Sequence, residues 1–411
     1  MGMDVPSWIM QDEDANIAKY SERLRSREIS SIELVTACLR RIEEWNTHLN
    51  AFITVLEEQA LDHARLAETE LKAGKWRGPL HGIPVAVKDF YDTAGIRTTA
   101  AFEPFRDRVP AKDAAVVARL KEAGAVIIGK TNMHTLGMGT TGLESYFGPV
   151  RNPWSADHIA GGSSAGSAVA VATGMCCATV DTDAIGSCRL PAACCGVVGF
   201  KGTYGLINSQ GILDGEEDPG EMIRWFSHPG IMTRTAQDAT LVVGVLMETG
   251  EAQPVDVAVA SAHGETMRIG VADNFRSDRE ISEAFSEAVE TVRGLGYSVT
   301  HVAAPLRVPT DDLSNIVSDR RDVIENVFGE IDALLLPTTA TTVPRVKDAR
   351  NSAQALSAEN TIFANYYGLP AISVPCSFDT SGLPTGLQIV GKPRDEISVL
   401  RLARQFQGAA H

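Results

Sequence analysis

The stretch that decides the fold runs from residue 161 to residue 192 and reads GGSSAGSAVAVATGMCCATVDTDAIGSCRLPA. Its pattern predicts a glycine- and serine-rich loop at 161–166, a helix of small residues at 167–175, a strand at 177–180 and a polar turn at 181–189. Both the loop and the turn bring serine to the boundary between a strand and a helix. This alternation of helix and strand is typical of an α/β protein.

The same alternation continues on both sides of this stretch and predicts a largely parallel sheet with helices on both faces. Apolar runs predict further strands at residues 83–87, 125–128, 268–272, 297–302, 333–336, 371–374 and 386–390. Helical spacing predicts helices at residues 32–42, 56–71, 113–123, 281–295 and 396–406. The first of these follows a capping-box pair, Ser30 and Glu33.

The pattern changes once along the chain, from helices alone to strands and helices in turn. We therefore expect a single domain over residues 1–411, with an N-terminal helical segment at 1–74 and an α/β core at 75–411. Residues 202–233 are the exception within the core, because they are expected to be long and irregular.

The composition disfavours several classes of protein. A net charge of −15 argues against a nucleic-acid partner, since binding to phosphates needs clustered lysine and arginine. No apolar run is long enough to span a bilayer, and the first residues do not resemble a signal peptide. The seven cysteines, an odd number, predict reduced thiols rather than a disulfide framework. We expect a cytoplasmic monomer or homodimer that binds a small molecule, and neither nucleic acid nor membrane.

One lysine and two serines carry the candidate chemistry. Lys88 follows the apolar strand at 83–87, and open α/β sheets place their sites at the carboxyl ends of strands. Serine is a poor nucleophile without a base, and burial at a strand end can lower the pKa of a lysine enough to make it one. Ser163 could carry the proton between Lys88 and Ser187. The N–H groups of residues 184–187 could form an oxyanion hole.

Two other mechanisms fit less well. Residues 162–166 match the Gly-x-Ser-x-Gly nucleophile elbow with Ser164 at its centre, but the preceding residues do not form the strand that this motif requires. The nine histidines are scattered, and no set of histidine and cysteine has the spacing of metal ligands. We therefore expect neither a metal nor a cofactor.

The motifs GGSSAGSA (161–168), DTDAIGSCRLPA (181–192) and GIPVAVKD (82–89) together resemble the amidase signature family. Further agreement extends from about residue 31 to the C-terminus in AGAVIIGKTNMHTLGMGTT, VRNPW, VVGFKGTYG, GIMTRTAQD, DALLLPTT, GLPAISVP and GLPTGLQIVG. The resemblance implies an α/β/α sandwich around a large mixed, mostly parallel sheet. Among family members the chain looks most similar to short bacterial aryl-amidases and urethanases.

The resemblance also implies a role for each site residue. Ser187 would be the nucleophile, Ser163 the bridging serine after a cis peptide at Gly162, and Lys88 the general base and acid. An ion pair of Asp183 and Arg189 would brace the nucleophile turn. The oxyanion would be held by the N–H groups of Ala184, Ile185, Gly186 and Ser187. Contacts to the substrate are expected from Gly137, Met138, Gly139, Met222 and Trp225.

The chain departs from the family pattern in two places that affect the substrate. Ile185 stands where the family has the first of two glycines before the nucleophile. Residues 302–332 are much shorter than in typical members and lack room for the usual covering helices. With the long acidic loop at 211–225, this predicts an open site with a mobile rim that accepts bulky aryl substrates.

These features favour a hydrolase that cleaves the C–N bonds of amides, anilides or carbamates. Hydrazides and small aliphatic amides remain alternative substrates, and a catalytically silent scaffold with the same fold is an alternative of another class. Some family members act on charged tRNA. The low basicity and the short segment at 302–332 argue against that role for this chain.

Overall fold

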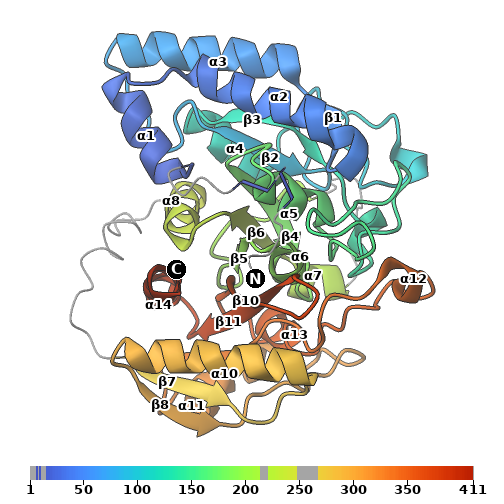
Figure 1. Cartoon of the computed structure of the whole chain (residues 1–411), viewed down its shortest axis with the longest axis vertical. Coiled ribbons are helices and arrows are strands. Elements are labelled where there is room, and N and C mark those ends of the chain that lie inside the picture. Colours follow the sequence, from blue (N-terminus) through green and yellow to red (C-terminus); the bar gives the residue numbers. More distant parts are fainter. Residues whose placement is uncertain (1–5, 8, 11–14, 213–220, 248–266, 411) are drawn as a thin grey trace.

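The computed structural model describes residues 6–7, 9–10, 15–212, 221–247 and 267–410. These residues contain one sheet of eleven strands, seen across the middle of Figure 1. In spatial order the strands are β1 (Phe52–Val55), β3 (Val126–Thr131), β2 (Pro84–Lys88), β4 (Ala178–Asp183), β6 (His228–Thr233), β5 (Val198–Lys201), β10 (Ala371–Phe378), β11 (Pro384–Gly391), β9 (Ala333–Pro337), β7 (Arg268–Ala272) and β8 (Ser298–Val302).

The predicted large mixed sheet is confirmed, but the expectation that it would be mostly parallel is wrong, because four of the ten pairs of described strands are parallel and six are antiparallel. The parallel pairs fall into two groups. The strands β3, β2 and β4 are parallel to one another, as are β9, β7 and β8. The pairs between these groups, from β4 through β6, β5, β10 and β11 to β9, are antiparallel, and so is β1 with β3. The parallel pairs therefore form two separate groups with the antiparallel strands between them, and the group of β3, β2 and β4 carries Lys88.

Helices cover both faces of the sheet, as predicted. One layer consists of α4 (Ala115–Glu122), α8 (Ala236–Leu246), α10 (Arg279–Gly294) and α14 (Glu396–Ala409). The other contains α2 (Ser31–Leu49), α3 (Glu57–Lys72), α5 (Ala165–Ala172), α6 (Arg189–Cys195), α11 (Ile316–Asn326) and α13 (Ile362–Tyr366). The other helices of the described residues are α1 (Ile17–Ser26), α7 (Glu221–Phe226) and α12 (Val346–Ala349), with 3-10 turns η1 (Glu103–Phe105) and η2 (Thr135–Gly137).

Alternate side chains of each strand fill the two layers, because successive residues of a strand point to opposite faces. In β2, Val85 and Val87 join the core beneath α4 and α8, whereas Ala86 joins the core beneath α5. In β9, Leu335 packs on one side and Leu334 on the other. The helices α1, α2 and α3 lie together at the β1 edge of the sheet (Figure 1), and β1 itself falls within the segment at 1–74 that was predicted to contain helices alone.

The region 202–233 departs from the prediction. We expected it to be irregular, but it contains α7 and the central strand β6. The sequence of β6, His-Pro-Gly-Ile-Met-Thr, includes two residue types that are depleted in strands. Pairing with β4 on one side and β5 on the other overrides this local preference. In the described parts of the chain, no helix is both long enough and apolar enough to cross a membrane.

Candidate active site

Lys88 is the last residue of β2, and its ammonium group points to Ser163. Its Nζ donates hydrogen bonds to Ser163 Oγ at 2.7 Å and to Thr182 Oγ1 at 2.9 Å. The side chain is 0% exposed. Burial lowers the pKa of Lys88 to about 8, although the negative charge of Asp181 opposes the shift. A lysine in this state is available as a base near neutral pH.

Ser163 precedes α5 and is held by its backbone. The peptide bond between Gly162 and Ser163 is cis, as the resemblance implied. Ser163 O accepts a hydrogen bond from the N–H of His134 at 2.9 Å. Gly162 is needed here because a Cβ atom on it would lie 2.9 Å from Gly139 O. The close approach of these two loops places the Ser163 hydroxyl against Lys88.

Ser187 lies in the turn between β4 and α6, and the Asp183 carboxylate organises that turn. Asp183 accepts hydrogen bonds from the N–H groups of Gly186 at 2.9 Å and Cys188 at 3.2 Å. Arg189 Nε and Nη2 donate to the same carboxylate at 3.0 and 2.8 Å, which confirms the predicted ion pair. Burial alone would raise the pKa of Asp183, but Arg189 holds it well below its usual range.

Residues from the C-terminal part of the chain hold the other side of this turn. Thr361 Oγ1 donates to Ile185 O at 2.5 Å, and Asn365 Nδ2 donates to Asp183 O at 2.8 Å. Gly186 has φ +126°, and a Cβ atom on it would lie 2.4 Å from Thr361 Oγ1. Only glycine fits at this position, for both reasons.

The predicted oxyanion hole needs one correction. The N–H of Gly186 was expected to face the substrate, but it is donated to Asp183. In the described part of the chain, the N–H groups of Ala184, Ile185 and Ser187 donate to no other group. These three groups are therefore the donors that remain for a developing oxyanion.

The two serines of the predicted triad are neighbours without a direct bond between their hydroxyls. Ser164 N donates to Ser187 O at 3.2 Å, which ties the two turns together. No hydrogen bond joins Ser163 Oγ and Ser187 Oγ among the described residues. Bonds of this kind often tighten only when the substrate is bound. Ser164 itself is 0% exposed, so it is poorly placed to act as the nucleophile of an elbow motif.

The predicted substrate contacts at η2 divide into two kinds. Gly137 lies at the triad, since a Cβ atom on it would be 3.7 Å from Ser163 Oγ. Met138 is 68% exposed and stands at the surface next to it. Gly139 instead allows the ring of His134 to pack, because a Cβ atom there would lie 2.3 Å from that ring.

The remaining predicted contacts, Met222 and Trp225, belong to α7, which was not predicted. Met222 is exposed, whereas Trp225 is half-buried and stacks on Tyr204 with the ring centroids 6.0 Å apart. Arg320 donates a hydrogen bond to Trp225 O at 2.6 Å. The rest of the predicted mobile rim, residues 213–220, lies outside the described residues.

The short segment at 302–332 covers this side more than the sequence predicted. It contains α11, whose Ile316 packs with Phe226 and Tyr366. Ile185 of the nucleophile turn lies against the same cluster. The segment therefore contributes one helix to this side, α11, which the sequence did not predict.

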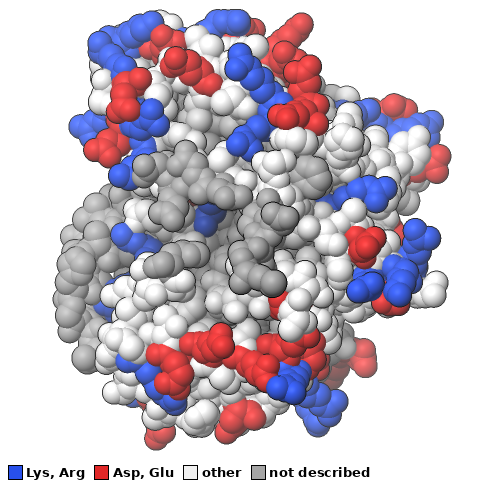
Figure 2. All heavy atoms as spheres, in the orientation of Figure 1, with Lys and Arg blue, Asp and Glu red and all other residues white. Residues whose placement is uncertain are grey.

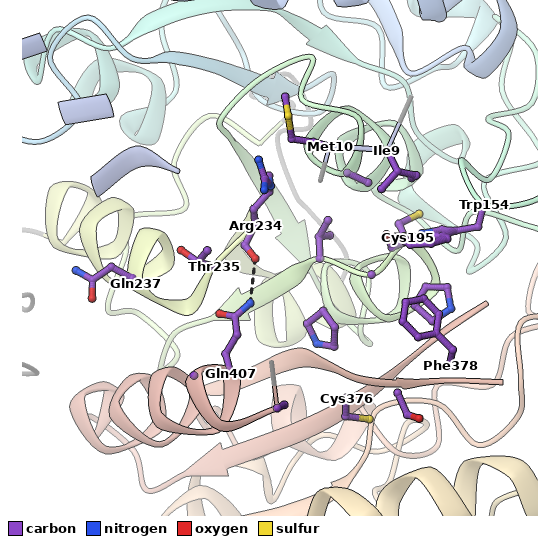
Figure 3. Close-up of a pocket in the computed structure, with 18 of the residues that line it drawn as sticks. Ile9, Met10, Trp154, Cys195, Arg234, Thr235, Gln237, Cys376, Phe378 and Gln407 are labelled. Atoms are coloured by element: carbon purple, nitrogen blue, oxygen red, sulfur yellow. Dashed lines mark hydrogen bonds between the residues drawn. The ribbon is translucent and has the colours of Figure 1, made fainter. Parts of the chain in front are cut away.

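A large hollow lies apart from these residues (Figure 3). Its volume is about 850 Å³, and Trp154, Cys195 and Phe378 line one side. On the other side, Gln407 Nε2 donates to Arg234 O at 3.1 Å. None of the predicted site residues lines this hollow.

Sequence reasoning missed four residues of the site. Thr182 lies in a quoted motif, but nothing in the sequence shows that it would reach Lys88. Asp181 lies beside it, and Thr361 and Asn365 are more than 170 residues from the turn that they hold. Such distant partners leave no local signal in the sequence.

The surface charge is mixed on the face drawn in Figure 2. Acidic and basic side chains are interspersed over the helices at both ends, and a row of acidic side chains follows α10. The expectation of a partner other than nucleic acid stays a prediction.

The chain is similar to one family model and to several known proteins. The family model described as Amidase matches residues 33–320 and 314–400. A glutamyl-tRNA(Gln) amidotransferase subunit from Geobacter metallireducens is 32% identical over 479 residues, covering 96% of this chain and 97% of the relative. A solved 6-aminohexanoate cyclic dimer hydrolase with substrate has a TM-score of 0.83 and 25% identity, covering 96% of this chain and 97% of its own. A bacterial aryl acylamidase shares the fold, with a TM-score of 0.83, 23% identity and 96% of each chain covered.

Proposed function

The chain belongs to the amidase family, whose members act on C–N bonds, and we propose that it hydrolyses small amides, anilides or carbamates through an acyl-enzyme on Ser187. The observation that carries this proposal is the 2.7 Å hydrogen bond from Lys88 Nζ to Ser163 Oγ in a site closed to solvent. A buried lysine bound to one serine, in a site where a second serine lies on the neighbouring turn, is equipped to move the proton of a nucleophile.

In the proposed reaction, Ser187 Oγ attacks the carbonyl carbon of the substrate. The proton of Ser187 passes to Ser163, whose own proton passes to neutral Lys88. The negative charge on the carbonyl oxygen is held by the N–H groups of Ala184, Ile185 and Ser187, near the start of α6. These donors are fixed before the substrate arrives, because Thr361 and Asp183 hold the turn on both sides.

The C–N bond then breaks. Lys88 returns its proton through Ser163 to the leaving nitrogen, and an ester of Ser187 remains. Water attacks this ester, with Lys88 again as the base, and releases the acid and free Ser187. For a carbamate the ester is a carbonate, so its hydrolysis yields carbon dioxide and an alcohol. Every step uses groups on the chain itself.

We place the acyl or aryl part of the substrate beside Gly137 and Met138. The exposure of Met138 next to Ser163 supports this placement, because an exposed thioether can adapt to a bulky apolar group. Met222 on α7 offers a second apolar contact. The seven free cysteines fit a reducing compartment, the cytoplasm.

A second candidate is the role of an amidotransferase subunit. The 32% identity with the glutamyl-tRNA(Gln) amidotransferase protein of Geobacter metallireducens, over 97% of that relative, favours it. The net charge of −15 favours the first candidate, since contact with tRNA needs basic surface. The two matched parts of the family model overlap at residues 314–320, within the segment predicted to be shortened.

One panel of substrates separates these candidates. It compares kcat/KM for an anilide, an aryl carbamate, a hydrazide, a small aliphatic amide and L-glutamine. The first proposal predicts that the anilide or the carbamate is the best substrate. If ammonia release from L-glutamine is faster than all other reactions, the amidotransferase role is supported instead. A folded chain that hydrolyses none of them and reacts with no serine-directed probe would be a scaffold.

A further inference from the structure

Asp181 is the lateral neighbour of Lys88 in the sheet. In the parallel pair of β2 and β4, Val87 is opposite Val180, so the next residues along the two strands are Lys88 and Asp181. Side chains at the same level of adjacent strands point to the same face. Both lie on the face covered by α5, and both are fully buried.

The carboxylate of Asp181 is surrounded by hydroxyl groups and has no cation bonded to it. Its Oδ2 accepts a hydrogen bond from Thr179 Oγ1 at 2.5 Å. The hydroxyls of Ser164 and Ser167, at the start of α5, lie close enough to favour its charged form, although no hydrogen bond of full strength reaches Oδ1 among the described residues. A buried carboxylate without a bonded cation is costly, and such groups often serve a function.

No direct ion pair joins Asp181 to Lys88. The ammonium is bonded to Ser163 and Thr182 instead, so it remains free to exchange a proton with Ser163. The charge of Asp181 acts on Lys88 from the neighbouring strand, whose backbone is about 5 Å away. Both side chains are fully buried, which strengthens the interaction. An interaction of this kind changes the charge state of Lys88 without occupying its hydrogen bonds.

The other titratable groups around the pair do not take this role. The charge of Asp183 is committed to Arg189. Burial raises the pKa of the Tyr91, Cys176 and Cys188 side chains well above their usual values, so they are neutral. Burial lowers the pKa of His134, so it is neutral too. Among these described groups, Asp181 is therefore the one that carries a negative charge near Lys88 without an ion-pair partner of its own.

We propose that Asp181 is a positioning residue that sets the pH at which Lys88 becomes a base and stabilises the ammonium that forms when Lys88 takes the proton of Ser187. This inference rests on the proposed function of Ser187 and Lys88. The ionised carboxylate stabilises the ammonium form of Lys88, so that the proton stays on Lys88 until it is transferred to the leaving nitrogen. Burial raises the pKa of Asp181 to about 6, so the carboxylate is ionised where Lys88 begins to lose its proton.

The test uses an alkyl fluorophosphonate, so that no substrate needs to be known. Ser187 Oγ forms a bond to phosphorus, the P–F bond breaks, fluoride leaves, and the proton of Ser187 passes to Lys88. The rate of this labelling, followed by mass spectrometry from pH 5.5 to pH 10, reports the basicity of Lys88. It is measured for the unmodified protein, for Asp181→Asn and for the control Asp238→Asn.

Asp238 is a matched control because burial raises its pKa to about 6 as well. It lies on α8 and accepts a hydrogen bond from Ala18 N at 3.2 Å, in the layer on the other face of the sheet. We expect Asp181→Asn to shift the midpoint of the rate profile down by about one pH unit or more. Asp238→Asn should leave the midpoint unchanged.

The outcomes separate this inference from the proposed function. A label on Ser187 with the same midpoint in Asp181→Asn, or with a higher one, would overturn the role of Asp181 alone. No label on Ser187 in the unmodified protein would overturn the proposed function. If Asp181→Asn does not fold, Thr179→Val removes the hydrogen bond to the carboxylate, which raises the pKa of Asp181. A smaller downward shift is then expected, and no shift would count against the inference.

Discussion

Lys88 Nζ and Ser163 Oγ are 2.7 Å apart, and neither side chain is more than 1% exposed. The base and the bridging hydroxyl are thus bonded before any substrate enters. Ser187 is 4% exposed at the edge of the same site.

Replacement of Ser187 by alanine should lower kcat by about 10⁴-fold or more, because the groups of a triad act as a unit. The fold should be retained, since the Ser187 side chain makes no hydrogen bond that holds the turn in the described structure. Circular dichroism checks the fold, and the fluorophosphonate label should disappear. A label that moves to Ser164 would support the nucleophile-elbow mechanism instead.

The activity should rise with pH on a limb with a midpoint of about 8, as Lys88 loses its proton. The activity rises with pH because the active form of Lys88 is the neutral one. Burial disfavours the ammonium form, so the neutral base forms at a lower pH than in an exposed lysine. Lys88→Ala should abolish the limb together with the activity. Lys88→Arg should be equally inactive, because a guanidinium stays protonated. An active arginine variant would contradict the role of Lys88.

Replacement of Arg189 by methionine should destabilise the protein by about 3–5 kcal/mol, because it leaves the Asp183 carboxylate buried and unpaired. Urea unfolding measures the change. The control is Arg268→Met, which breaks an ion pair with Asp332 at the surface and should leave the midpoint almost unchanged. Equal effects of the two variants would show that the buried pair does not support the turn.

Replacement of Gly186 by alanine should remove most of the activity. The added Cβ atom must displace Thr361, and the backbone must keep a φ of +126°. Displacement of Thr361 releases Ile185 O and moves the predicted oxyanion donors. The control is Gly294→Ala in α10, where a Cβ atom meets nothing within 4 Å. That variant should be neutral or slightly stabilising in a thermal melt.

Replacement of Met138 by serine should raise KM for an anilide with a smaller effect on kcat. The reason is that a contact to the substrate made equally in the ground state and the transition state affects binding alone. The matched variant Met222→Ser tests the same role on α7. If both variants leave KM for anilides and aliphatic amides unchanged, the apolar contacts lie elsewhere, and the Ser187 chemistry is unaffected.

Local patterns were sufficient to predict most elements and the pairing of Lys88 with Ser163. The strand at β2 is an apolar run that ends at Lys88, and both serine turns carry short motifs. The prediction failed where local preference and tertiary pairing disagree. Pro229 cannot donate to a sheet, so β6 has no strand signal, yet it pairs on both sides near the centre.

The oxyanion hole shows a second limit of sequence reasoning. The turn has four N–H groups that could bind an oxyanion. The sequence does not reveal which of them donate to other groups of the protein instead. Asp183 takes one of them because Arg189 holds its carboxylate in place. Thr361 and Asn365 complete the turn from a distance of 176 and 182 residues. Their contribution depends on the assembled sheet and not on any local motif.

The dependence of the nucleophile turn on distant residues has a consequence for biosynthesis. Arg189 donates to Gln388 Oε1 at 2.5 Å and to Thr361 O at 3.0 Å, so the turn is braced by a strand and a helix that the ribosome makes long after it. A nascent chain that has emerged only as far as β5 already contains Lys88, Ser163 and Ser187. It lacks the partners that hold Ser187 in position. We therefore expect such a chain to be inactive until residues 361–388 have been synthesised and packed against the turn.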